Sequence, residues 1–264
     1  MNSRNNGLAD PAHNVYRRAL DVLNRADFPF LIGGAFALNH YTGVHRDTKD
    51  IDLFILPHDY ERGLQILDKA GFSVSRSYPH WLGKASFGDY QIDIIFSSGN
   101  AIGKVDSLWF KHAEQGEVLG TRVQFCPAEE MIWSKAFIME RERHDGADIM
   151  HLLLFRNEVM DWQRLLERFD GHWRVLLSYL VLFGFVYPSE KAKIPQSVMN
   201  MLLERLRSDL SRKPAEDKIC QGTLLSRQQY RIDVDQWGYL DARLRPLGGM
   251  TEEEINLWSH SDGD

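Results

Sequence analysis

The chain has 264 residues, of which 44% are hydrophobic and 26% charged, as in an ordinary soluble globular protein. Its formal net charge of -6 argues against a protein whose whole surface binds a polyanion such as DNA. The two cysteines, Cys126 and Cys220, form no disulfide framework and lack zinc-ligand spacing, so each is expected to be a buried free thiol. No signal-peptide core and no apolar stretch of membrane-spanning length is found, which predicts a cytoplasmic protein without a membrane partner.

The first half of the chain combines helix and strand signals. Apolar residues at helical spacing predict a helix over 11–26, and an apolar run closed by two glycines predicts a buried strand over 28–34. A short helix over 35–41 and a strand over 50–56 are expected next. Pro57 then begins a predicted helix that ends at Gly71. Further strands are expected at 72–78, 80–87, 90–98 and 122–126, with Gly88-Asp89 as a hairpin turn.

The second half of the chain is predicted to be helical. From Pro127 to about residue 210 the hydrophobic pattern has helical spacing and contains no strand signal. Residues 211–218 are typical of a loop, and the signals after them are too mixed for an assignment. The sequence therefore predicts an α+β fold. A mixed sheet flanked by helices would occupy residues 1–125, and a mainly helical domain over 126–264 would complete a cleft.

Two aspartates on the predicted strand 50–56 are the first candidate functional residues. Alternate side chains of a strand point the same way, so Asp50 and Asp52 place two carboxylates side by side. Two like charges repel one another unless a positive group lies between them, and Mg²⁺ commonly binds a pair of carboxylates together with substrate phosphates. The alternative is the solvent-facing polar side of an edge strand.

Two further features support a site for phosphoryl transfer. Gly33 and Gly34 precede a predicted helix, where glycine lets the backbone approach a ligand and the first N–H groups of a helix can bind an anion. An ordinary strand-to-helix turn is the alternative. Asp93 lies among isoleucines on another strand, where a buried carboxylate needs a partner or a metal. Together these residues predict a two-metal site next to a phosphate-binding turn.

The segment over 33–54 resembles the signature of the DNA polymerase β-like nucleotidyltransferase superfamily. That signature has a glycine pair, a short helix, an Asp-hydrophobic-Asp strand and a third aspartate on a later strand. With Arg46 and Thr48 before the Asp pair, the segment is similar to the AbiEii-type branch, which is known from bacterial toxin and abortive-infection systems. The matching signature positions in this chain are Gly33, Gly34, Asp50, Asp52 and Asp93.

Residues 129–153 are similar to a second segment of that branch, in which a lysine on one helix is followed by an Arg…Asp-x-x-Asp run. The matching positions are Lys135, Arg143, Asp145 and Asp148. The resemblance implies that the lysine contacts nucleotide phosphates and that one aspartate supports it or the chemistry. By residue type alone, Lys135 would be a solvated helix residue. Arg46 could clamp a phosphate or only cap its loop.

The resemblance implies a nucleotidyltransferase that moves a nucleoside monophosphate from a triphosphate such as ATP to an acceptor hydroxyl. Two kinds of acceptor are open, a small hydroxyl compound and an RNA end. The negative net charge suits a cationic small molecule, whereas RNA would need a local basic surface. A catalytically silent binding module, such as an antitoxin or regulator, is the alternative, although it has no need of three repelling carboxylates. Asp50, Asp52 and Asp93 would be catalytic and bind Mg²⁺ or Mn²⁺, and the nucleotide would contact Gly33, Gly34, Arg46, Thr48, Lys135, Asp145 and Asp148.

Overall fold

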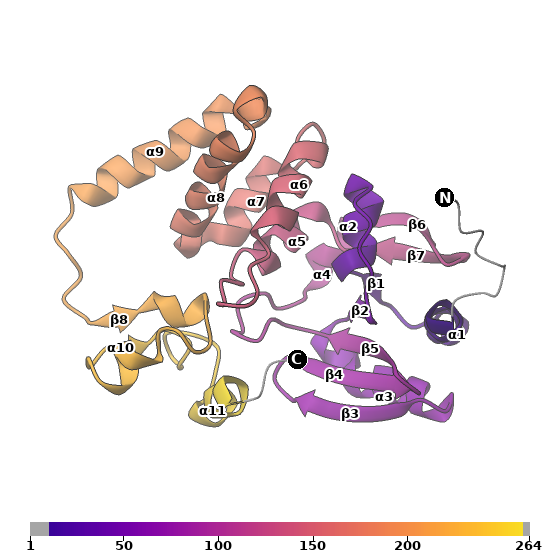
Figure 1. Cartoon of the computed structure of the whole chain (residues 1–264). Helices are drawn as coiled ribbons and strands as arrows, with labels where there is room; N and C mark the ends of the chain where they lie inside the picture. Colours follow the sequence, from indigo (N-terminus) through magenta and orange to yellow (C-terminus); the bar gives the residue numbers. More distant parts are fainter. Residues whose placement is uncertain (1–10, 261–264) are drawn as a thin grey trace, which may run out of the picture. The chain divides into compact units, whose positions relative to one another are not determined.

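The structure is a computed structural model that describes residues 11–260 and has two compact units (Figure 1). Within the described range, the first unit comprises residues 11–37, 45–96 and 105–126, and the second comprises 38–44, 97–104 and 127–260. The first contains a mixed sheet with helices, and the second is mainly helical. The α+β class expected from the sequence is therefore confirmed.

The sheet of the first unit has seven strands in the order β3-β4-β5-β2-β1-β7-β6. The central strand β2 pairs in parallel with β5 and antiparallel with β1, while β1 pairs in parallel with β7. The remaining neighbours are antiparallel pairs. The strands are β1 (Leu31–Ile32), β2 (Asp50–Phe54), β3 (Ser73–Tyr78), β4 (Leu82–Phe87), β5 (Tyr90–Ile95), β6 (Glu114–Val118) and β7 (Thr121–Phe125).

One face of this sheet belongs to the hydrophobic core. On β2 and β5, Ile51, Leu53, Ile92 and Ile94 are at most 1% exposed, and α1 and α3 pack against this side of the sheet. The residues that alternate with them on β2 are only half-buried, so the other face is available to carry a site. The helices that begin in this unit are α1 (Pro11–Arg25), α2 (Gly34–Thr42), α3 (Tyr60–Lys69), which follows a 3₁₀ turn at Pro57–Asp59, and α4 (Ser107–Lys111).

The second unit is built around α5 to α9. Helix α6 packs against α5 and α8, and α7 packs against α5 and α8, with Leu152, Leu153, Leu176 and Phe183 at most 1% exposed in the shared core. Within residues 11–260, no helix is both long enough and apolar enough to cross a membrane. The helices are α5 (Ala128–Lys135), α6 (Gly146–Arg156), α7 (Trp162–Phe169), α8 (Trp173–Val186) and α9 (Gln196–Leu210), with 3₁₀ turns at Asp170–His172 and Pro188–Lys193.

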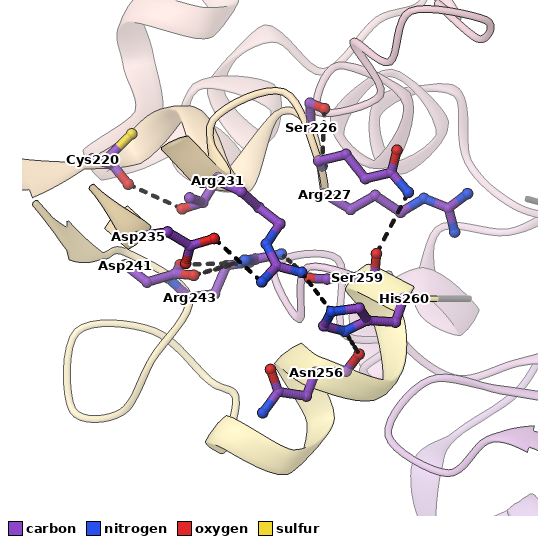
Figure 2. A network of polar contacts seen from close by, with 12 residues as sticks. Cys220, Ser226, Arg227, Arg231, Asp235, Asp241, Arg243, Asn256, Ser259 and His260 are labelled. Carbon is purple, nitrogen blue, oxygen red and sulfur yellow. Dashed lines mark hydrogen bonds and ion pairs between the residues drawn. The ribbon is translucent and has the colours of Figure 1, made fainter. Parts of the chain in front are cut away.

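Residues 219–260, which gave no clear sequence signal, are organised around a buried arginine. Figure 2 shows Arg243 reaching the carboxylate of Asp241, with Nε and Nη2 donating at 3.0 and 2.7 Å, and the hydroxyl of Ser259 at 3.3 Å. Arg243 is only 1% exposed, so this buried ion pair and the contact to Ser259 join β9 to α11. Cys220 and Cys126 are both buried, as expected, and are not joined in a disulfide. The elements here are β8 (Ile219–Cys220), a 3₁₀ turn (Gln221–Leu224), α10 (Arg231–Asp235), β9 (Leu240–Asp241) and α11 (Glu252–His260).

Candidate active site

The Asp50–Asp52 pair lies on the half-exposed face of β2, at the centre of the sheet. Its neighbours Ile51 and Leu53 point to the opposite, fully buried face. The alternation that the sequence predicts for this strand is therefore observed. The polar edge-strand alternative does not apply, because β2 pairs with a strand on either side.

The sheet register places the third aspartate directly beside this pair. In the parallel pairing of β2 with β5, Asp52 is opposite Asp93 and Asp50 is opposite Gln91. Neighbouring strands lie roughly 4.8 Å apart, and directly paired residues have side chains on the same face. Three carboxylates therefore project from one small area of the sheet.

Hydrogen bonds from neighbouring side chains orient two of these carboxylates. The Thr48 hydroxyl donates to Asp50 Oδ1 at 2.5 Å, and Gln91 Nε2 donates to Asp93 Oδ1 at 2.7 Å. Among the residues from 11 to 260, no three His, Cys, Asp or Glu side chains are already arranged around a common metal position. The all-oxygen donor set nevertheless suits a hard cation such as Mg²⁺. Binding one would require the carboxylates to turn toward one another, and metal binding by these residues stays a prediction.

The glycine pair packs tightly against the same face of β2. The Gly33 N–H donates to the Asp52 carbonyl at 2.9 Å, and α2 begins at Gly34, which has a φ of +51°. A Cβ at Gly34 would lie 1.7 Å from Asp52 Oδ2, and one at Gly33 would lie 2.2 Å from the ring of Phe54. Only glycine therefore allows this close approach, and it brings the Asp52 carboxylate against the backbone where α2 begins.

The two remaining candidates of the first unit lie in the loop before β2. Thr48 is half-buried and has a clear role in the structure, because its hydroxyl contacts Asp50. Arg46 is exposed on the same loop, so its side chain is accessible to a ligand.

The second unit brings the other predicted group together. Lys135 lies at the end of α5, and its Nζ is 2.8 Å from Asp145 Oδ2 and 2.9 Å from Asp148 Oδ2. Asp145 is the residue before α6, Asp148 is in the first turn of that helix, and Arg143 Nε contacts Asp145 Oδ1 at 3.4 Å. The Lys135 side chain is only 13% exposed, so the solvated-helix alternative is wrong.

The ion pairs around Lys135 keep its ammonium group and the Asp145 carboxylate charged. Burial favours the neutral form of Lys135, but Asp145 and Asp148 outweigh burial and raise the pKa of the ammonium group. Burial likewise opposes ionisation of Asp145, yet Lys135 and Arg143 lower the pKa of its carboxyl. Burial, and then the nearby charge of Asp145, raises the pKa of Tyr179 to about 12, so this phenol stays protonated and donates to the Ala136 carbonyl.

Two residues on the polar face of the sheet were missed in the sequence. Gln91 hydrogen bonds Asp93, and Lys84 on β4 is directly opposite Asp93 in the antiparallel β4–β5 pair. The hairpin turn at Gly88-Asp89 contains the signal that could have found Lys84. Phe87 and Tyr90 lie on either side of the turn and pair with each other. Three residues further from the turn on each strand, Lys84 therefore pairs with Asp93.

Neither a protein-family model nor a curated protein matches the chain, but solved structures do. The antibiotic-resistance factor ANT(2'')-Ia is 18% identical over 62% of this chain and 94% of its own, with a TM-score of 0.46. The lincosamide antibiotic adenylyltransferase LnuA is 15% identical over 54% and 96%, with a TM-score of 0.40. A nucleotidyltransferase-like protein from Paracoccidioides brasiliensis is 13% identical over 70% and 92%, with a TM-score of 0.45.

Each of these likenesses is distant, with a TM-score below 0.5. The activity therefore has to be inferred from the chain's own residues. None of these matches distinguishes the AbiEii-type branch from the rest of the superfamily.

Proposed function

We propose that the chain is a metal-dependent nucleotidyltransferase whose catalytic residues are Asp50, Asp52 and Asp93. The observation that carries the proposal is the register of the central sheet. It sets Asp52 opposite Asp93 and places both, with Asp50, on the half-exposed face next to the glycine pair. Such a cluster repels itself in isolation, and a binding module would gain nothing from keeping it.

The proposed reaction is attack of an acceptor hydroxyl oxygen on the α-phosphorus of a nucleoside triphosphate. A bond forms between that oxygen and phosphorus, the bond to the β-phosphate bridging oxygen breaks, and pyrophosphate leaves. Mg²⁺ or Mn²⁺, held by the three aspartates, would supply the positive charge that stabilises the triphosphate and acidifies the hydroxyl. Asp93 accepts the hydroxyl proton. The N–H groups in the first turn of α2, which begins at the Gly33–Gly34 pair, bind the β- and γ-phosphates.

The proposal extends to further residues with different support. Thr48 holds the Asp50 carboxylate through its hydroxyl. Arg46, exposed on the preceding loop, is a candidate phosphate clamp. For Lys135, together with Asp145 and Asp148, we retain the contact to nucleotide phosphates that the family resemblance implies. A place in a toxin–antitoxin pair, with a protein partner, rests on that resemblance alone.

Calorimetry and a transfer assay together test the proposal. The full chain is titrated with each nucleoside triphosphate, with Mg²⁺ and with a chelator. It is then incubated with α-labelled triphosphates, total RNA and a panel of hydroxyl compounds. We expect binding that depends on the metal and label that moves to one acceptor class. Equal affinity with and without chelator would overturn the metal-bridged model, and metal-dependent binding without any transfer would indicate the silent binding module.

A further inference from the structure

Two rows of paired residues cross the half-exposed face of the sheet from β1 toward β3. The first row continues from the Asp52–Asp93 pair to Lys84 on β4 and then to Ser75 on β3. On the β1 side, the same row begins with the bond from the Gly33 N–H to the Asp52 carbonyl. The second row, two residues away along the strands, contains Asp50, Gln91, Ser86 and Ser73.

The direction of the proposed reaction follows from this order, and the inference below rests on the proposed function. In phosphoryl transfer the attacking and leaving oxygens lie roughly in line across the phosphorus. The phosphate-binding backbone of Gly33 and Gly34 is on the β1 side of Asp52, so pyrophosphate leaves over β1. The acceptor hydroxyl must therefore approach from the opposite side, over β5 and β4. Asp93, the proposed proton acceptor, lies on β5.

The surface that the acceptor meets there has a distinct chemistry. Strands β3 and β4 contain no acidic residue, and beyond Asp93 their half-exposed face presents hydroxyl groups and one ammonium group. Lys84 is one strand spacing, roughly 5 Å, past Asp93, and an oppositely charged cross-strand pair of this kind is favourable before substrate binds. A cationic acceptor would find no carboxylate on these two strands and would face this lysine.

We propose that Lys84 determines acceptor specificity and binds a phosphate group carried close to the reacting hydroxyl. The ammonium group supplies a charge-assisted hydrogen bond to that phosphate. The hydroxyl of Ser75, which is opposite Lys84 on β3 and contacts Ser77 Oγ at 3.1 Å, is the neutral group next to it. The acceptor class is thus a phosphate-bearing hydroxyl compound. The phosphate can belong to a mononucleotide or to the last phosphodiester of an RNA 3′ end.

The test compares two acceptor probes that differ only in the phosphate. The full chain is saturated with Mg²⁺ and an α,β-methylene triphosphate, which occupies the donor position, and is then titrated with uridine 5′-monophosphate or with uridine. The variants are Lys84→Met, which keeps the aliphatic stem, and Lys84→Arg, which keeps the charge. The matched control is Lys69→Met, an exposed lysine at the end of α3.

We expect the monophosphate to bind at least about tenfold more tightly than uridine, the size of one charge-assisted hydrogen bond. Lys84→Met should remove that preference without changing uridine affinity, whereas Lys84→Arg and Lys69→Met should keep it. A short oligoribonucleotide serves as a third probe. Affinity at least tenfold above that of the mononucleotide would identify an RNA end as the source of the phosphate, and equal affinity would identify the mononucleotide.

Transfer of labelled nucleotide, measured on the same variants, separates this inference from the proposed function. If label moves to an acceptor but Lys84→Met leaves the phosphate preference unchanged, the specificity role is overturned and the transferase proposal stands. If phosphate binding depends on Lys84 but no acceptor receives label, the binding surface stands and the transferase proposal fails. Tighter binding of a polyamine such as an aminoglycoside than of the monophosphate would also overturn the inference.

Discussion

Replacing Gly34 by alanine should separate the backbone cost of a left-handed residue from the cost of disturbing the site. The φ of +51° at this position disfavours any side chain, by roughly 1–2 kcal/mol. The new Cβ would also lie 1.7 Å from Asp52 Oδ2, where ordinary contact begins at 3.4 Å. The carboxylate oxygen must therefore retreat by about 1.7 Å, which Asp52 can do by side-chain rotation for about 0.5–1.5 kcal/mol.

A metal ligand has to reach its ion to within roughly ±0.2 Å of the preferred distance, and a methyl group at position 34 would restrict the orientations from which the Asp52 carboxylate can do so. Gly34→Ala should therefore lower the free energy of unfolding by only about 1.5–3.5 kcal/mol and yet lose its metal-dependent nucleotide affinity. Gly88→Ala is the matched control, since Gly88 has a φ of +59° and open space where its Cβ would lie. It should show the backbone cost alone and bind nucleotide normally.

Urea unfolding and calorimetric titration with Mg²⁺ and a nucleoside triphosphate measure both effects. Normal nucleotide affinity in Gly34→Ala would refute the reasoning, since the Asp52 carboxylate would then have no part in binding. A stability loss far above that of Gly88→Ala would show that the Asp52 side chain cannot rotate away. The main role of Gly34 would then be to let α2 pack closely against β2.

Three other perturbations have defined outcomes. Lys135→Met should lower the free energy of unfolding by about 3–5 kcal/mol, because two buried carboxylates lose their cation; a loss under 1 kcal/mol in urea unfolding would assign it to the weak, solvent-screened class of ion pairs. Burial opposes ionisation of Asp241, but hydrogen bonds from its arginine partner hold the carboxyl pKa below the ordinary 3.8, so its stabilising contribution is present above that pH and lost as pH falls through the lowered pKa. The stability gap between wild type and Asp241→Asn, followed by unfolding at several pH values, should accordingly shrink at acid pH, and a gap independent of pH would contradict the assignment. Asp93→Asn keeps an oxygen acceptor for Gln91, and it loses both the attraction of Lys84 and the repulsion of Asp52, so stability should change by less than about 1 kcal/mol while transfer activity falls by several orders of magnitude; a large stability loss would indicate a structural role.

The elements near the proposed site could be predicted because their patterns are local. The strand over 50–56 is observed as Asp50–Phe54, and the hairpin around Gly88-Asp89 is observed with the register its turn dictates. Strand period two is enough to assign Asp50 and Asp52 to one face. Glycine before a helix likewise indicates a close backbone approach without any tertiary information.

Other features depend on contacts that the sequence does not contain. Strand β6 was not predicted because its residues, Glu114 to Val118, are mostly polar and lack a clear apolar alternation. The partners of Lys135 come from the next helix, so its burial depends on how α5 and α6 pack. The C-terminal segment, where β8 and β9 are two residues each, gave no periodic signal because a buried ion pair, and not an amphipathic element, holds it together.

The packing of α11 constrains how the protein can be shortened without damage. The ring of Trp258 occupies the space where Gly99 would carry a side chain, and Ser259 provides the hydroxyl that Arg243 contacts. A truncated chain that ends before α11 would lose both contacts and would expose Arg243, which is normally buried, to water. Proteolytic trimming near residue 250 should therefore be followed by rapid digestion of the region after residue 218.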